Sequence, residues 1–248
     1  MSPTLTAWTK SPPVLRLPPD EVHVWRASLS QTQKNLQFCW EMLAEDERQR
    51  AERFHFERDR HHFIAARGIL RQLLGQYLNV EPRRLYFKYT SYGKPFLANT
   101  NVGAELRFNV SHSGELALYA FSRPRELGVD IEKIRPDIEH RSIAKRFFSE
   151  QEVATLFTLP VKRQRQAFFL CWTRKEAYIK AIGEGLSLPL HTFDVSLVPG
   201  EPAVLLAVRG TGREAERWTL RDLQPGADYE AALVAEGNDW HLKCWQWT

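Results

Sequence analysis

The clearest hydrophobic pattern of the chain is helical and lies in residues 163–183. Apolar side chains recur there close to helical spacing, and neither proline nor glycine interrupts the segment before Gly183. This spacing predicts a long helix that ends at that glycine. The positions that carry the pattern are Phe168, Trp172, Ile179 and Ile182.

Charged residues accompany the last turns of this predicted helix. Glu176 and Lys180 are four residues apart, so they share one face of a helix, and we expect Lys175 beside them. A solvent-exposed salt bridge would by itself explain the pair, with a contribution of about 0.3–0.5 kcal/mol. A second stretch of the chain changes that interpretation.

This second stretch, residues 127–133, alternates between apolar and acidic side chains. A period of two predicts a strand with one buried face, and it places Asp130 and Glu132 on the same side. Two acids on one face repel each other unless a cation lies between them. With Glu176 added, the three carboxylates are typical of an oxygen-only site for Mg²⁺. Lysines beside such a site would hold phosphate oxygens.

The remaining patterns predict an α+β protein. Ser149 followed by Glu152 resembles a capping box, which would start a further helix. The alternative role of Glu152 is that of a general base near the metal. Helices are predicted at residues 43–56, 61–78 and 138–148, and strands near residues 22–25, 85–89, 106–110, 116–121, 191–198, 203–208, 218–223, 231–235 and 242–245.

Three segments describe the expected organisation of the chain. Residues 1–20 are rich in proline and predict an extended arm, and residues 21–122 and 123–248 predict two halves that meet near Arg123 and Pro124. The chain has no 18-residue apolar run and its first residues lack the apolar core of a signal peptide, so we expect no membrane span and a cytoplasmic protein. Its three cysteines have no metal-ligand spacing, and free thiols are expected.

Composition and charge narrow the function only slightly. With 43% hydrophobic and 26% charged residues, the chain is an ordinary globular protein. Its 34 basic and 30 acidic residues give a net charge of +4. Acids are interspersed with the arginines of residues 43–78, which disfavours a nucleic-acid-binding surface. These arginines form either a solvated helix face or phosphate contacts, for which guanidinium groups are suited.

Five motifs together resemble those of a known family, the 4′-phosphopantetheinyl transferases of the large, surfactin-synthetase (Sfp-like) type. Their order and spacing along residues 40–195 match the family pattern. The motifs are Gly93-Lys94-Pro95, Phe108-Asn109-Val110-Ser111-His112-Ser113, Gly128-Val129-Asp130-Ile131-Glu132, Phe147-Phe148-Ser149-Glu150-Gln151-Glu152 and Trp172-Thr173-Arg174-Lys175-Glu176-Ala177-Tyr178-Ile179-Lys180.

The resemblance implies a fold and a reaction. It implies two similar α/β halves related by pseudo-twofold symmetry, with the active site in the cleft between them and a monomeric chain. The reaction would transfer 4′-phosphopantetheine from coenzyme A to a serine of an apo acyl, peptidyl or polyketide carrier protein and release 3′,5′-ADP. Mg²⁺, or alternatively Mn²⁺, would be the metal.

The resemblance also implies roles for individual residues. Metal ligands would be Asp130, Glu132 and Glu176. Lys180 would contact the transferring phosphate or protonate the leaving oxygen. Glu152 would deprotonate the carrier serine, with Glu176 as the competing assignment. The expected contacts of coenzyme A are Lys175 and His112 at the nucleotide phosphates, and Lys94, Ser111, Arg48, Arg50, Arg53 and Arg67 nearer the adenosine and 3′-phosphate.

One departure from the family and three rival interpretations remain. The charged first helix often carries lysines in this family, and here the comparable positions are mostly Arg and Glu.

The rivals are another Mg²⁺-dependent nucleotide enzyme, a nucleic-acid-binding module, and a carrier-binding relative without catalysis. The presence of all the expected carboxylates and lysines counts against the last of these.

Overall fold

The first half of the chain forms a sheet and a helical layer. The computed structural model describes residues 7–98, 105–183 and 188–248, so residues 1–6 of the predicted arm lie outside it. The elements of this half are β1 (Thr9–Lys10), β2 (Glu21–Ser28), α1 (Gln33–Met42), α2 (Glu45–Glu52), α3 (Glu57–Leu78), β3 (Phe87–Tyr89), β4 (Pro95–Leu97), β5 (Arg107–Ser113) and β6 (Leu116–Ser122).

The second half repeats the combination of a sheet with a long helix. The predicted long helix is confirmed and ends at Gly183, whose φ of 77° is the left-handed conformation that glycine adopts easily. The elements are β7 (Leu127–Lys133), α4 (His140–Phe147), α5 (Glu150–Thr158), α6 (Val161–Ile182), β8 (Phe193–Val195), β9 (Leu205–Val208), β10 (Trp218–Leu223), β11 (Tyr229–Glu236) and β12 (His241–Gln246).

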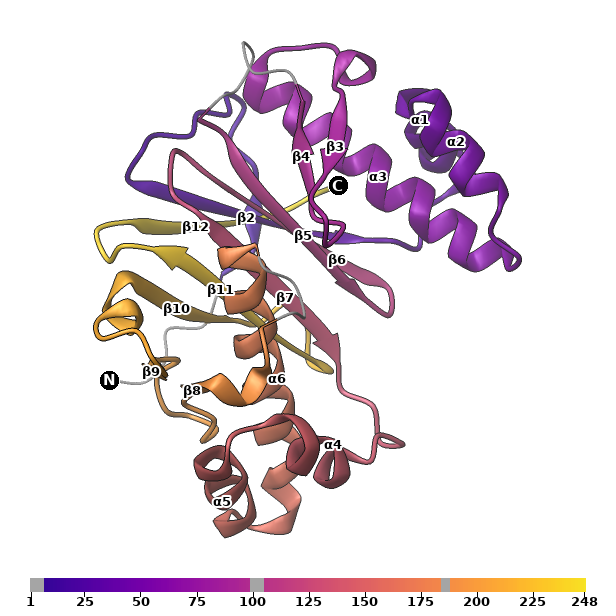
Figure 1. Ribbon diagram of the computed structural model, residues 1–248. Coiled ribbons are helices and arrows are strands. Elements are labelled where there is room, and N and C mark those ends of the chain that lie inside the picture. Colours follow the sequence, from indigo (N-terminus) through magenta and orange to yellow (C-terminus); the bar gives the residue numbers. More distant parts are fainter. Residues whose placement is uncertain (1–6, 99–104, 184–187) are drawn as a thin grey trace.

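Two sheets pack face to face in the middle of the molecule (Figure 1). One sheet has the strand order β1-β12-β2-β6-β5, and the other has the order β10-β11-β7. Their facing side chains form an apolar core that includes Val24 and Leu118 from the first sheet and Val129 and Leu233 from the second. The predicted α+β class is therefore confirmed.

The helices cover the outer faces of the two sheets. Helix α3 packs on the five-stranded sheet, where the Tyr119 hydroxyl donates to the carbonyl of Ala66 at 3.0 Å, and α1 packs against α3. Helix α6 packs on the three-stranded sheet, where Ala177 shares a core with Ala232. The result is a four-layer arrangement, helix–sheet–sheet–helix, in which strands β5 and β7 lie next to each other between the helical layers (Figure 1).

The last strand crosses between the halves. Strand β12 lies parallel to β2 in the five-stranded sheet, with Leu242 opposite Val22 and Cys244 opposite Val24. The predicted division into residues 21–122 and 123–248 does not account for β12, which belongs to the second segment but pairs with a strand of the first. The C-terminus of the chain therefore helps to hold the two sheets together.

A glycine sets the distance between α6 and its sheet. A Cβ atom on Gly128 of β7 would lie 2.1 Å from the carbonyl oxygen of Ala177 and 2.4 Å from the backbone nitrogen of Ala181. Only glycine permits this approach of strand and helix. The close contact places Asp130 and Glu132 on β7 directly beside the last turns of α6.

Several expectations differ from the structure. Helix α1 was not predicted, because only Leu36 and Cys39 of its ten residues are buried and its apolar pattern is weak. The expected strand at residues 191–198 is a 3₁₀ turn followed by the short strand β8. All three cysteines are buried free thiols, as expected. Within the described ranges, none of the helices is both long and apolar enough to cross a membrane.

Candidate functional site

The centre of the site is the carboxylate of Asp130 on β7. Its Oδ1 atom accepts hydrogen bonds from the Ser111 hydroxyl at 2.8 Å and from the Lys180 ammonium at 2.6 Å, and Lys180 also donates to Ser111 at 2.9 Å. The Oδ2 atom is buried and has no hydrogen-bond partner within the described part of the chain. Buried carboxylate oxygens are normally satisfied, so this atom is available to a ligand.

Glu132 lies next to Asp130 on the same face of β7. The Ser113 hydroxyl donates to its Oε2 atom at 2.8 Å. Partial burial raises the pKa of the Glu132 carboxyl, and the negative charge of Asp130 adds to this effect. The predicted placement of both acids on one side of the strand is consistent with their two serine partners, Ser111 and Ser113, which alternate along β5 and so share one of its sides.

Glu176 of α6 faces the same pair of acids. Partial burial, together with the nearby charge of Asp130, raises the pKa of Glu176 to about 7. A carboxyl group with this pKa is balanced between its protonated and ionised forms near neutral pH. Such a group is suited to accept a proton from a substrate.

The oxygen donors of this site fit Mg²⁺. Among the described residues, no group of three or more His, Cys, Asp or Glu side chains converges closely enough to hold a metal. Asp130 and Glu132 nevertheless supply two adjacent carboxylates, one of which has an unpartnered oxygen. Mg²⁺ is often held in proteins by one or two carboxylates, with water and substrate phosphates completing the octahedron.

A large basic pocket of about 600 Å³ opens beside this centre; we call it the arginine pocket. It lies between α3, strand β5 and the β3–β4 hairpin, and aromatic residues also line it. Arg67 contributes a largely buried guanidinium group that donates to the Tyr89 hydroxyl at 2.8 Å, while its Nη1 atom is buried and unpartnered in the described structure. Its basic lining residues are Arg50, Arg58, His62, Arg67 and His112.

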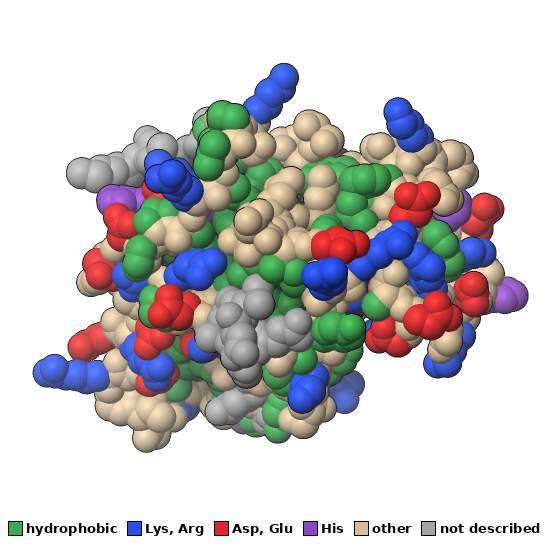
Figure 2. All heavy atoms as spheres, turned by 90° about the horizontal axis from the view of Figure 1, so that it is seen from above, with side chains coloured by type: hydrophobic (Ala, Val, Ile, Leu, Met, Phe, Trp, Pro, Cys, Tyr) green, Lys and Arg blue, Asp and Glu red, His purple; other side chains and the backbone are tan. Residues whose placement is uncertain are grey.

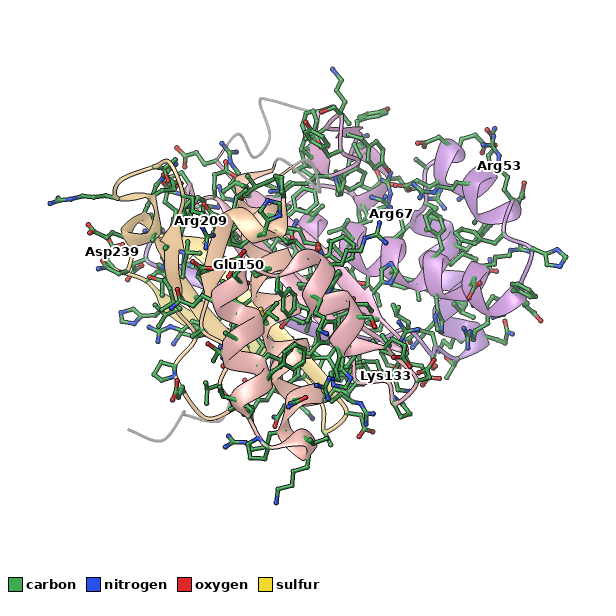
Figure 3. The ribbon with its side chains drawn as sticks, turned by 60° about the horizontal axis from the view of Figure 1, so that its bottom comes forward. Arg53, Arg67, Lys133, Glu150, Arg209 and Asp239 are labelled. Carbon is green, nitrogen blue, oxygen red and sulfur yellow. The ribbon has the colours of Figure 1, made fainter. Side chains whose placement is uncertain are left out.

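Two of the predicted arginines lie outside this pocket. Arg48 donates to the carbonyl oxygen of Glu41 and its guanidinium lies over the Trp40 ring at 5.6 Å. Arg53 is exposed and lies at the outer edge of the α1–α3 layer, whereas Arg67 lies nearer the middle of the molecule (Figure 3). The structure therefore brings Arg50 and Arg67 to the site but not Arg48 or Arg53.

A second pocket of about 440 Å³ lies between the two halves; we call it the α6 pocket. From the first half, the β3–β4 hairpin and β5 contribute Tyr92, Lys94 and Val110. From the second half, α6 contributes Glu176, Ile179 and Lys180, among others. The candidate site thus lies where the halves meet, in agreement with the predicted cleft.

Lys94 makes a contact between the two halves of the chain. Its Nζ atom donates to the backbone carbonyl of Lys180 at 2.6 Å, near the carboxyl end of α6. Burial lowers the pKa of Lys94, which disfavours its charged form in this position. The bond links the β3–β4 hairpin of one half to the helix of the other.

Lys175 and Glu152 form a buried ion pair with each other. Lys175 is fully buried and donates to Glu152 at 2.8 Å and to the carbonyl oxygens of Leu190 and Phe193 at 2.8 and 2.5 Å. Both oxygens of Glu152 are engaged, because one also accepts from the Val195 amide and the other forms the capping box. The nucleotide contact of Lys175 and the general base at Glu152 stay predictions, and in this structure both side chains are engaged with each other and with backbone groups instead.

Some residues of the site were missed by the sequence analysis. Arg58 and His62 line the arginine pocket, and their spacing of four on α3 could have indicated a shared face. Ser113 belongs to the same motif as Ser111, and its alternation with Ser111 predicts the same side of a strand. Tyr89 and Tyr92 carry no signal of their own, because only the hairpin geometry directs them to different pockets.

The face of the molecule in Figure 2 does not suggest a nucleic-acid interface. On the face shown in Figure 2, basic and acidic side chains alternate, and no large area of one sign is present. A protein that follows a phosphate backbone usually shows a continuous basic band.

Comparisons with known proteins agree on one family. A family model described as the 4′-phosphopantetheinyl transferase superfamily matches residues 126–234, and one described as 4′-phosphopantetheinyl transferase, N-terminal, matches residues 24–123. The chain is 42% identical to the 4′-phosphopantetheinyl transferase HetI of Nostoc sp., over 97% of this chain and 98% of the relative.

Two further similarities cover a smaller part of the chain. The 4′-phosphopantetheinyl transferase Sfp of Bacillus subtilis is 34% identical over 62% of this chain and 66% of the relative. Among solved structures, holo-[acyl-carrier-protein] synthase of Thermotoga maritima matches with a TM-score of 0.34 and 21% identity, over 45% of this chain and 62% of that one.

Proposed function

The chain belongs to the 4′-phosphopantetheinyl transferase family, and we propose from its site how it transfers 4′-phosphopantetheine from coenzyme A to a serine of an apo carrier protein. The observation that carries this proposal is the Ser111–Asp130–Lys180 cluster. It provides a cation and an unpartnered carboxylate oxygen beside the two pockets. A pyrophosphate needs both a cationic contact and a metal at such a position.

The arginine pocket is the proposed site of the nucleotide of coenzyme A. Its guanidinium and imidazole groups provide donors for the 3′-phosphate and the pyrophosphate, and the unpartnered Nη1 atom of Arg67 is one such donor. Phe54, Phe63 and Tyr89 offer aromatic faces for the adenine ring. His112 lies in the same pocket, and burial, followed by the charge of Lys180, lowers its pKa.

Asp130 and Glu132 are the proposed protein ligands of Mg²⁺. The bound ion would neutralise charge on the pyrophosphate oxygens of coenzyme A. Lys180 donates to a pyrophosphate oxygen in the same region, and it keeps the negative charge of Asp130 partly balanced before substrate binds. The structure thus favours two carboxylate ligands rather than the three that the sequence analysis predicted.

Glu176 is the proposed general base. The serine hydroxyl oxygen of the carrier attacks the phosphorus that bears the pantetheine, its proton passes to Glu176, and the bond from that phosphorus to the bridging oxygen breaks. The products are the serine phosphodiester and 3′,5′-ADP, which leaves with the bridging oxygen. A pKa of about 7 allows Glu176 to accept the proton near neutral pH.

The proposed partners are coenzyme A and an apo acyl, peptidyl or polyketide carrier protein. One chain supplies both walls of the α6 pocket, so the site is complete in a monomer. The three unpaired cysteines suit a reducing compartment, and we propose a cytoplasmic location.

The release of 3′,5′-ADP tests this function against the rival Mg²⁺-dependent nucleotide enzyme. The protein is incubated with coenzyme A and Mg²⁺ alone, with an apo carrier, and with the same carrier whose acceptor serine is replaced by alanine. We expect 3′,5′-ADP only with the intact apo carrier. Equal release in all three reactions would identify a pyrophosphate hydrolase instead.

A further inference from the structure

Two arginines of helix α3 share a single carboxylate. Arg67 and Arg71 are four residues apart on one face of the helix, and their guanidinium groups lie 5.0 and 5.1 Å from the centroid of the Phe87 ring. Like charges at this spacing repel each other. The carboxylate oxygens of Glu47 in α2 lie 3.4 Å from the Nε atom of Arg67 and 2.6 Å from that of Arg71. The carboxylate therefore offsets the repulsion, and the three side chains together keep one positive charge.

Arg71 uses its donor groups inside the protein. Its side chain is 1% exposed, and its Nε group donates to Glu47. Its Nη1 group donates to the carbonyl oxygens of Pro82 at 2.7 Å and Leu85 at 3.1 Å. These bonds tie α3 to the segment that leads into β3, so Arg71 has a structural role.

Arg67 keeps one donor group for a ligand. Its Nη2 group donates to the Tyr89 hydroxyl at 2.8 Å and its Nε group faces Glu47, whereas its Nη1 group has no hydrogen-bond partner among the described residues. The side chain lines the arginine pocket. Because a guanidinium group is planar and rigid, contacts that fix Nε and Nη2 also fix the direction of Nη1.

Glu47 is itself held in one position. Its side chain is 3% exposed, and the oxygen that pairs with Arg71 also accepts from the Ala44 amide at 3.0 Å, in the capping box of α2. Its other oxygen has Arg67 as its ion-pair partner. A buried carboxylate is unfavourable unless cations and donors surround it. The two arginines meet this requirement, and Glu47 in turn links them to the start of α2.

We infer that Glu47 is a positioning residue, which holds the guanidinium group of Arg67 so that its Nη1 group meets a phosphate of the coenzyme A nucleotide. This inference rests on the proposed function, which assigns that nucleotide to the arginine pocket. A prearranged guanidinium group loses less conformational entropy on binding a phosphate than a mobile one does. Glu47 acts through Arg67, since its own negative charge would repel a phosphate.

Replacement of Glu47 by glutamine tests the inference, because glutamine has the same shape and an oxygen that can complete the capping box. Glu47→Gln should raise the dissociation constant of coenzyme A, measured by calorimetric titration, by roughly three- to tenfold. Turnover at saturating coenzyme A should stay unchanged, because the cluster of Asp130 and Lys180 is intact. Glu52→Gln removes the same charge from an exposed position of the same helix and should alter neither quantity.

Arg67→Met separates positioning from a general loss of structure. In the Arg67→Met protein, adding Glu47→Gln should change the dissociation constant of coenzyme A by less than about twofold, because the group that Glu47 positions is gone. A purely structural effect of Glu47→Gln would weaken coenzyme A by the same factor with or without Arg67.

A second variant does not disturb the buried carboxylate. Tyr89→Phe removes the other contact that holds Arg67 and keeps the aromatic ring. The side chain of Tyr89 is 41% exposed, so this change should alter the free energy of unfolding little. We expect Tyr89→Phe to raise the dissociation constant of coenzyme A by roughly two- to fivefold, and to have no effect in the Arg67→Met protein.

The inference is overturned if Glu47→Gln leaves the affinity for coenzyme A unchanged or strengthens it, since the carboxylate would then be neutral or repulsive. Additive effects of Glu47→Gln and Arg67→Met would overturn it as well. If Glu47→Gln does not fold, the same comparisons made with Tyr89→Phe decide. All these outcomes leave the proposed function intact, whereas a wild-type protein that does not bind coenzyme A would overturn both.

Discussion

At the scale of single residues, Asp130 connects all the groups on which the proposed chemistry depends. Ser111 and Lys180 contact one of its oxygens, and the other is left for a metal. Its charge also contributes to the raised pKa values of Glu132 and Glu176. A change at this one carboxylate therefore affects the binding of metal, the position of Lys180 and the ionisation of both neighbouring acids.

Replacement of Asp130 should separate activity from folding. We expect Asp130→Ala to reduce transfer to below about one hundredth of the wild-type rate, because a metal ligand is lost. The melting temperature should change by only a few degrees, because the loss relieves repulsion between carboxylates and Lys180 is 28% exposed and can reach water. Asp239→Ala, which removes an exposed carboxylate far from the site, is the matched control. Normal transfer by Asp130→Ala would remove this residue from the metal site.

Lys180 should act on turnover more than on binding. Lys180→Ala is expected to lower turnover by roughly a hundredfold, the usual cost of losing a charge-stabilising donor. The affinity for coenzyme A should fall less, because the basic side chains of the arginine pocket remain. Single-turnover kinetics and calorimetry on the same variant separate the two effects. A loss confined to affinity would make Lys180 a binding residue.

Glu176 predicts a pH dependence of stability for the metal-free protein. Its pKa of about 7 in the folded chain exceeds the value of roughly 4.3 in an unfolded chain, so the folded state binds more protons between these values. The free energy of unfolding should therefore fall as the pH rises through this interval and level off above it. Glu176→Gln should flatten the slope in urea unfolding from pH 5 to 8. An unchanged slope would show that the proton is held elsewhere.

At the scale of elements, the contact between β7 and α6 assembles the site. Strand β7 carries Asp130 and Glu132, and α6 carries Glu176 and Lys180. Their approach depends on the missing side chain of Gly128. The packing of β7 against α6 therefore requires glycine at position 128, and this packing in turn positions the acids and the lysine of the site.

Gly128→Ala should therefore damage both stability and activity. The added methyl group would lie 2.1 Å from a backbone oxygen, and backbone must move to relieve the contact. We expect a loss of about 3 kcal/mol in the free energy of unfolding and a large loss of transfer. Gly212→Ala, whose added Cβ meets no atom within 4 Å, should alter neither quantity. A Gly128→Ala protein with normal stability and activity would contradict this account of the site.

The elements also show where sequence patterns succeed. The apolar spacing of α6 and the alternation of β7 are strong local signals, and both elements were predicted with the correct ends to within two residues. The face of Lys175 was predicted wrongly, because consecutive helical residues are about 100° apart and do not share a face with each other. The capping box of Ser149 and Glu152 is confirmed. The ion pair that Glu152 also forms with Lys175 could not be predicted in this way, because it depends on the packing of α5 against α6.

At the scale of the whole molecule, the site exists because distant segments meet. The β3–β4 hairpin and the end of α6 are separated by 86 positions at the Lys94–Lys180 contact. The return of β12 to the first sheet joins residues 241–246 to residues 21–26. No local pattern specifies either arrangement, since both follow from the packing of two sheets. The sequence therefore predicts most of the side chains that meet in the candidate site, but not the division of the cleft into two pockets.

Mass spectrometry of an apo carrier protein tests the central claim most directly. The carrier is incubated with this protein, coenzyme A and Mg²⁺, with and without EDTA. The account predicts a mass gain of one phosphopantetheine on the acceptor serine, which EDTA prevents. An unmodified carrier under all conditions, across acyl, peptidyl and polyketide types, would contradict the proposed transferase activity.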